Sequence, residues 1–213
     1  MVAHEYAHGW VAFKNGDPTA YQLGRLTWNP VKHIDPFMTI LLPAFLALTP
    51  GAPILGGAKP VPVNPRNYRN FKKGDILVSL AGIATNIVLA FLFTAAIPLL
   101  FLLWRAFPRA QAGVAIMQYM CIMGIGLNLV LAAFNLIPIP PLDGSHVVKY
   151  LLPASWALRY EQFGRYGIIV LVLLLYGGGR VLQVWMSPAA SVASRLLARV
   201  QPLVLPSADQ WLR

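Results

Sequence analysis

The sequence is poor in charge, in acidic residues and in cysteine. Charged residues make up 11% of its 213 residues and hydrophobic residues 57%, whereas about a quarter of a soluble domain is charged. This composition excludes an ordinary soluble enzyme domain and a disordered region. Cys121 is the one cysteine, which excludes a disulfide framework and a thiolate-rich metal cage. The sequence therefore predicts a membrane protein.

Long apolar runs are abundant instead. A helix rises 1.5 Å per residue, so about 20 apolar residues cross the hydrocarbon core of a bilayer. Three runs are long enough to do so and are predicted as transmembrane spans: Ile76 to Trp104, Ala112 to Ile139, and Tyr166 to Met186. The opening stretch, Met1 to Phe13, is predicted to be helical but too short to span. Nothing at the N-terminus has the pattern of a removable signal peptide, so we expect the first helix to target the chain.

A fourth apolar stretch, Phe37 to Leu55, is interrupted by Pro43, Pro50 and Pro53. Each proline removes a backbone donor. We expect a broken or re-entrant segment, which membranes tolerate only where protein or a water-filled cavity covers it. Counted together with the N-terminal helix, the spans number five or four, depending on whether this segment crosses.

The basic residues follow the predicted membrane edges. The 17 Lys and Arg outnumber the 7 Asp and Glu, and the excess suits anionic lipid headgroups better than nucleic acid. The stretch from Gly56 to Asp75 is rich in Lys and Arg, so the positive-inside rule predicts that it is cytoplasmic. Counting spans from there puts Pro140 to Arg165 on the same side.

The C-terminal tail, residues 189–213, is predicted to lie at the membrane interface. Val192, Leu196 and Val200 recur at helical spacing, and Arg195 and Arg199 lie opposite them. An interfacial amphipathic helix has this pattern.

The strongest chemical signal is His-Glu-x-x-His, formed by His4, Glu5 and His8. On a helix, residues four apart lie on one face, so the two imidazoles can bind one zinc ion. Glu5 lies beside them, where a carboxylate can accept a proton from the water that the metal activates.

A catalytic zinc needs a third protein ligand and an open position. Asp143 follows an apolar run that ends in Pro138, Pro140 and Pro141, which break a helix near the membrane boundary. Its carboxylate either binds the metal or caps the helix that follows, because aspartate is a favoured N-cap. The other candidates are the remaining acidic residues: Asp17, Asp35, Asp75, Glu161 and Asp209.

His-Glu-Tyr-Ala-His-Gly-Trp at 4–10 and Asn-Leu-Ile-Pro-Ile-Pro-Pro-Leu-Asp-Gly at 135–144 resemble the site-2 protease family of intramembrane zinc metalloproteases. Residues 57–65 and 81–86 also resemble its short prokaryotic members, which lack PDZ and CBS domains. The resemblance implies one zinc ion per chain, held by His4, His8 and Asp143, with Glu5 as catalytic base. Family members carry more apolar residues ahead of the histidine motif, so the first transmembrane helix is expected to be truncated here.

Two further roles concern the substrate. Asn135 immediately precedes the proline break, where its amide either donates to a peptide carbonyl or developing oxyanion or caps the helix. A helical substrate must unwind before its peptide bonds can be attacked. The segment from Gly57 to Val63 alternates valine and proline. Val61 and Val63 are its candidates for pairing with an extended substrate strand.

We therefore expect an all-α fold: one membrane-embedded metalloprotease domain over residues 1–213, a multi-pass helical bundle with broken or re-entrant segments and room for short strands in its loops. The expected function is an intramembrane zinc endopeptidase that cuts transmembrane protein substrates, in the plasma membrane and more specifically a prokaryotic inner membrane. The alternative is a catalytically inactive scaffold or a metal-binding membrane protein. The presence of Glu5 argues against that alternative, because metal binding alone needs no general base. We expect no nucleic-acid partner, and the sequence does not indicate an oligomeric state.

Overall fold

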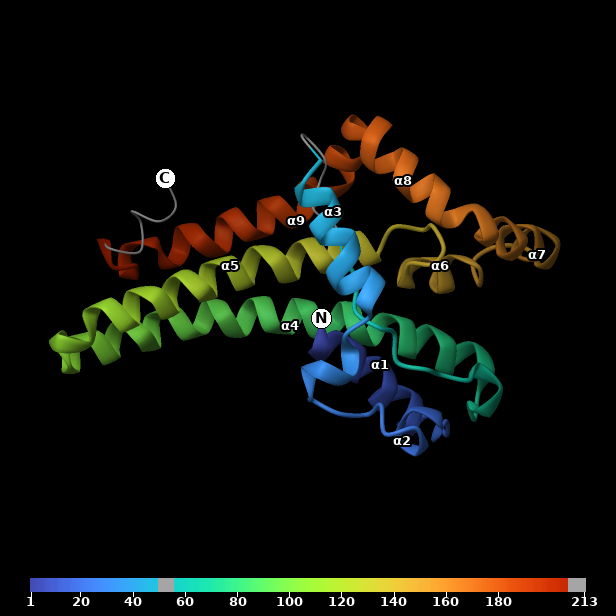
Figure 1. Cartoon of the computed structure of the whole chain (residues 1–213), viewed down its shortest axis with the longest axis horizontal. Helices are drawn as coiled ribbons and strands as arrows, with labels where there is room; N and C mark the ends of the chain where they lie inside the picture. Colours follow the sequence, from blue (N-terminus) through green and yellow to red (C-terminus); the bar gives the residue numbers. More distant parts are fainter. Residues whose placement is uncertain (50–55, 207–213) are drawn as a thin grey trace. The chain divides into compact units, whose positions relative to one another are not determined.

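The computed structural model describes residues 1–49 and 56–206, and these residues form helices, turns and loops without a β-strand. The all-α prediction is therefore confirmed. The described loops contain none of the short strands for which the prediction left room. Figure 1 shows the order of the main helices: α1 (Val2–Lys14), α2 (Thr19–Gln22), α3 (Leu42–Ala47), α4 (Phe71–Ala106), α5 (Gln111–Asn135), α6 (Asp143–Val148), α7 (Ala154–Phe163), α8 (Gly167–Gly177) and α9 (Gly179–Val200).

Two helical stretches are long and apolar enough to cross a membrane, namely α4 and Pro108–Asn135, which contains α5. They correspond to the first two predicted spans. The third predicted run is not one continuous helix, because α8 ends at Gly177 and α9 begins at Gly179. Glycine has a low helix propensity, and three glycines in succession place the break here. The pair counts as a third span if both helices belong to one crossing.

The proline-interrupted segment is described only as far as residue 49. Pro36–Leu41 forms a short π-helix that continues directly into α3, and together they are shorter than a span. The Asp35 side chain caps this segment by accepting hydrogen bonds from the N–H groups of Phe37 and Met38. Residues 50–55, with the last two prolines, lie outside the described residues.

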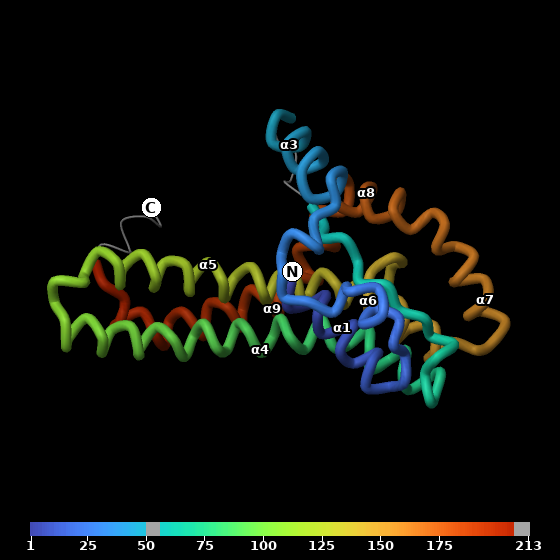
Figure 2. The backbone as a smooth tube through the Cα atoms, turned by 60° about the horizontal axis from the view of Figure 1, so that its bottom comes forward, coloured from blue at the N-terminus to red at the C-terminus, as the bar shows by residue number. Residues whose placement is uncertain are grey.

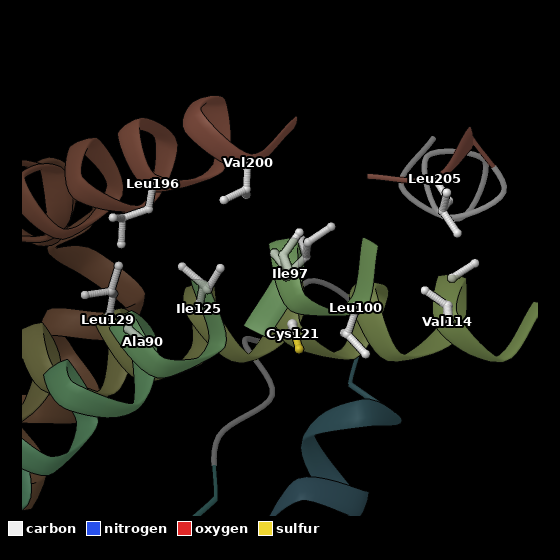
Figure 3. Close-up of a cluster of buried hydrophobic side chains, with 12 residues drawn as sticks. Ala90, Ile97, Leu100, Val114, Cys121, Ile125, Leu129, Leu196, Val200 and Leu205 are labelled. Atoms are coloured by element: carbon white, nitrogen blue, oxygen red, sulfur yellow. The ribbon is translucent and has the colours of Figure 1, made fainter. Parts of the chain in front are cut away.

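The chain falls into two compact units. Unit 2 comprises residues 86–134 and 183–213. Its core is an apolar cluster between α4, α5 and α9, and Figure 3 shows Leu196 of α9 directed toward Leu129 of α5. The polar side chain of Gln118 is fully buried in this unit, and it donates to the Leu203 carbonyl and accepts from the Leu205 N–H. The C-terminal segment is thereby joined to α5 by hydrogen bonds.

The amphipathic pattern near the C-terminus corresponds to the second half of α9. Leu196 and Val200 of its apolar face are buried in the cluster with α5, and Val192 is exposed. These two side chains therefore contact protein. The interfacial position of residues 189–213 stays a prediction, and residues 207–213 lie outside the described part of the chain.

Unit 1 comprises residues 1–85 and 135–182 and contains all the candidate site residues placed by the structure. Figure 2 shows α1 beside the loop that leads into α4. Ala12 of α1 packs against Tyr68 of that loop and Val78 of α4. This small apolar cluster connects α4 with α1, the helix that contains the two histidines.

Asp17 supplies a polar link between the same elements. Its side chain is fully buried and accepts hydrogen bonds from the Asn64 N–H at 2.6 Å, from the Asn67 amide at 2.8 Å, and from the hydroxyl and N–H of Thr19. Burial by itself would raise the pKa of the Asp17 carboxyl, but these hydrogen bonds outweigh burial and lower it. The ionised carboxylate therefore connects the residues that follow α1 to the loop at residues 64–67 by hydrogen bonds.

Replacing Asp17 with Asn should lower the free energy of unfolding by about 1–3 kcal/mol at neutral pH, because an amide nitrogen would face the N–H donors. A carboxyl with a lowered folded pKa stabilises the fold above its unfolded value of about 4 and loses that contribution as the pH falls. The difference in the free energy of unfolding between the parent and the Asp17→Asn variant should thus become smaller below pH 4. Thermal unfolding in detergent checks both effects. Asp35→Asn is the control, since Asn caps a helix as well as Asp does.

Candidate metal centre

The two histidines of the motif lie in successive turns of α1 and face the interior of unit 1. His4 is 7% exposed and His8 is 9% exposed. Their Nε2 atoms are 2.9 Å apart. The helical spacing thus brings two potential ligand atoms to one point, as the motif predicted.

α4 orients one of these rings. His8 Nδ1 lies 2.6 Å from the Val78 carbonyl oxygen, a contact in which the ring N–H donates. A proton on Nδ1 leaves the Nε2 lone pair available as a metal ligand. The backbone of α4 thereby selects the tautomer of His8 that can bind a metal at Nε2.

Asp143 brings the third ligand atom from a distant part of the chain. Its Oδ2 lies 3.2 Å from His4 Nε2 and 3.4 Å from His8 Nε2. Asp143 is the first residue of α6, and the N-cap is Leu142, which makes no side-chain cap. The Asp143 side chain thus makes no cap and faces the two imidazoles, and its role as a metal ligand stays a prediction.

Gly144 permits this placement. A Cβ atom at this position would lie 2.3 Å from the Leu136 carbonyl oxygen, well inside van der Waals contact. The chain after the proline break can therefore fold back closely against the end of α5 only with glycine here. This close approach sets where α6 begins and hence where Asp143 lies.

The donor set fits a zinc ion. One ligand atom from each of His4, His8 and Asp143 lies within 4.8 Å of the other two. Asp143 Oδ2 is buried without a hydrogen bond of acceptable geometry, although it faces two imidazole nitrogens. Two imidazoles and one carboxylate, with a fourth position left open, are a common protein ligand set for catalytic zinc.

The carboxyl of Asp143 is in the form that binds metal. Burial by itself would raise its pKa, but the polar contacts with His4 and His8 outweigh burial and lower the pKa to about 2. Asp143 is thus ionised at neutral pH, and a carboxylate contributes negative charge to a cation site.

Glu5 lies next to His4 in the same turn, and its Oε2 accepts a hydrogen bond of 2.9 Å from the Val61 N–H. Val61 is 6% exposed. Gly9 allows the loop to approach this closely, since a Cβ there would lie 2.9 Å from a Val61 methyl group. The loop at residue 61 therefore fixes the direction of the predicted catalytic carboxylate.

The predicted substrate-binding residues have less direct structural support. The Val61 N–H is already donated to Glu5, and Val63 packs against the cluster of Ala12, Tyr68 and Val78. Asn135 is the last residue of α5 and is half-buried. Strand pairing by Val61 and Val63 and oxyanion binding by Asn135 stay predictions.

The other acidic candidates for the third ligand serve elsewhere in the structure. Asp17 holds a loop, Asp35 caps a helix, and Asp75 pairs with Lys149, which also lies 3.6 Å from Glu161. Asp209 lies outside the described residues.

One residue of the centre, Gly82, is not among the predicted site residues. A Cβ atom on Gly82 of α4 would lie 2.5 Å from His8 Nε2 and from His4 Cε1. Gly82 thus leaves the space that both imidazoles occupy. A glycine inside a long apolar helix is unfavourable by about 1 kcal/mol relative to alanine, which was the available signal for a close approach.

Residues 1–176 match the sequence profile described as Peptidase family M50. The chain belongs to this family, whose members are the site-2 proteases. It is 41% identical to "Putative zinc metalloprotease YwhC" of Bacillus subtilis over 177 residues, covering 82% of this chain and 75% of that protein. The resemblance seen in the two motifs is confirmed, and the chain is a member of a metalloprotease family.

Two mycobacterial proteins extend the comparison. The chain is 30% identical to "Putative zinc metalloprotease Rip2" of Mycobacterium tuberculosis, over 93% of this chain and 73% of that protein. It is 29% identical to the Mycolicibacterium smegmatis protein of the same name, over 82% of this chain and 62% of that protein. No solved structure matches the chain.

Gly82→Ala should lower zinc affinity at least 10-fold, because the added methyl group displaces both imidazoles from the positions that face Asp143. Zinc affinity is measured by competition with a chelator in detergent. Gly126→Ala is a matched control, since a Cβ at that helical position has no neighbour within 4 Å. Parent-like affinity in Gly82→Ala would contradict the close packing at this position.

Proposed function

We propose that the chain is an intramembrane zinc endopeptidase that hydrolyses peptide bonds in or near transmembrane segments of other proteins. The observation that carries this proposal is the convergence of His4, His8 and Asp143 beside Glu5, in a chain with two helical stretches able to cross a membrane. Membership of the peptidase family supports the hydrolytic part of the proposal.

A single zinc ion per chain, held by His4, His8 and Asp143, would polarise the scissile carbonyl and bring the pKa of a water molecule toward 7. Glu5 accepts the proton of the attacking water and passes it to the leaving amine. The Val61 N–H holds the Glu5 carboxylate in one orientation, and the Val78 carbonyl does the same for the His8 ring. These contacts keep the proton acceptor and the ligands in place before the substrate arrives.

The proposed substrate class rests on the two helical stretches able to cross a membrane. A transmembrane helix hides its peptide groups in its own hydrogen bonds, so a substrate helix must become extended before the water that Glu5 deprotonates can attack a peptide carbonyl. The loop with Val61 and Val63 lies directly on α1, next to the base. An extended substrate strand pairs with this loop, and Asn135 donates to its carbonyl or oxyanion.

The proposed location is the plasma membrane, as a multi-pass protein of a prokaryotic inner membrane. The two spanning-length stretches and the family support the membrane assignment, and the named relatives above are bacterial. The alternative function, a metal-binding scaffold without catalysis, leaves unexplained why Glu5 is held against the site by a backbone donor.

Asp143→Ala tests the metal centre. The purified parent chain should contain about one zinc ion per molecule, and the variant should contain little, because two imidazoles alone do not complete a three-ligand site. Elemental analysis of both proteins measures the ratio. A parent chain without zinc, or a variant with full zinc content, would refute the ligand set.

Glu5→Gln tests catalysis separately from metal binding. The amide cannot accept the proton, so cleavage of a transmembrane substrate in vesicles should fall by about 10²- to 10⁴-fold. Zinc content should stay at the parent level, since Glu5 is not a ligand. Equal cleavage by parent and variant would exclude Glu5 as the base, and cleavage by neither would favour the scaffold.

A further inference from the structure

The face of α4 that meets the metal centre carries three functional positions: Asp75, Val78 and Gly82. Their spacing of three and four residues places them in line along one side of a helix. Val78 orients His8 through its carbonyl, and Gly82 leaves room for both imidazoles. Two of the three proposed ligands are therefore positioned by direct contact with α4.

Asp75 links the same face of α4 to the segment that carries the third ligand. It is 3% exposed. Its carboxylate accepts from Lys149 Nζ at 2.7 Å and from the Tyr150 hydroxyl at 2.9 Å, and it lies 3.4 Å from His146 Nδ1. His146 belongs to α6, and Lys149 and Tyr150 follow directly after its last residue, Val148.

This link is needed because α6 cannot hold its own position. It covers only Asp143–Val148, and a helix this short is not stable without tertiary contacts. At its start, Gly144 packs against the Leu136 carbonyl. At its end, the buried Asp75 carboxylate binds His146, Lys149 and Tyr150. A buried carboxylate is strongly unfavourable without such partners, so the arrangement favours a single position of α6.

We propose that Asp75 is a positioning residue for the metal ligand Asp143. It acts through α6 and touches neither the metal nor the substrate. α4 thus positions all three ligands of the centre without supplying a ligand itself. The inference rests on the proposed function, because it concerns the zinc site of that peptidase.

The test is the zinc affinity of the full-length chain in detergent, measured by chelator competition at a temperature where every variant is folded. Asp75→Asn keeps the size of the side chain but removes the charge that Lys149 binds. Zinc affinity should fall by about 10- to 100-fold, as for other residues that orient metal ligands. The visible absorption spectrum of bound cobalt should also change, because it reports the geometry of the ligands.

Asp17→Asn is the matched control. It also removes a buried, hydrogen-bonded carboxylate from unit 1, but Asp17 contacts Thr19 and the loop at residues 64–67 and not α6. It should lower the thermal midpoint and leave zinc affinity and the cobalt spectrum at parent values. Tyr150→Phe removes only the hydroxyl that donates to Asp75. This milder variant should fold even if Asp75→Asn does not, and it should lower zinc affinity about 2- to 10-fold.

The outcomes separate the inference from the proposed function. Parent-like zinc affinity in both Asp75→Asn and Tyr150→Phe overturns the inference and leaves the proposed function intact. An equal loss of affinity in Asp17→Asn also overturns it, because general destabilisation would then be the cause. A parent chain that binds no zinc overturns both.

Discussion

Two imidazoles and a carboxylate share a space against α4 that would not accommodate one additional methyl group. A Cβ atom at Gly82 would lie 2.5 Å from His8 Nε2, and Asp143 Oδ2 lies within 3.4 Å of both rings. This close approach fixes where α1 and α6 can lie. The contacts around it maintain that arrangement: Val78 to His8, Val61 to Glu5 and Asp75 to the end of α6.

The two units are stabilised by different interactions. Unit 2 has a continuous apolar cluster between long helices, and Gln118 is a polar side chain that joins the C-terminal segment to it. Unit 1 consists of short helices and loops, so buried polar groups with several partners connect its parts. Asp17 binds the loop after residue 63, and Asp75 binds the end of α6. Hydrogen bonds are directional, and a hydrolytic centre requires such directional placement of its ligands and base.

The contact between Glu5 and Val61 lies where the proposed chemistry and the proposed substrate strand would meet. The Glu5 carboxylate, the proposed base, is oriented by a backbone N–H from a loop that is itself packed onto Gly9 of α1. A substrate strand that pairs with this loop would therefore lie beside the base that acts on it. Binding and proton transfer would then depend on the same few residues of the loop.

The sequence by itself determined the features that depend on local spacing. His4 and His8 lie on one helical face because they are four residues apart, and the apolar runs that became α4 and α5 were predictable from their length. The position of Asp143 in the sequence left two roles open, metal ligand or helix cap, and the resemblance to the family motif favoured the ligand. The Phe37 segment begins as a helix over Pro36–Ala47 that runs through Pro43, and a break at Pro50 or Pro53 stays a prediction, because both lie outside the described residues.

Only the tertiary structure decided which residues meet across the chain. The contacts of Val78 with His8, of Val61 with Glu5 and of Asp75 with Tyr150 join residues 56 to 75 positions apart. No pattern along the chain specifies such pairs, because helical periodicity relates only near neighbours. The separation of α8 from α9 at Gly178 is a different case, because it has a local cause, three successive glycines, inside a run that was predicted as one span from its apolar length. Local spacing therefore indicates which chemistry to expect, and long-range packing decides how the proposed ligands and the proposed base are held in place.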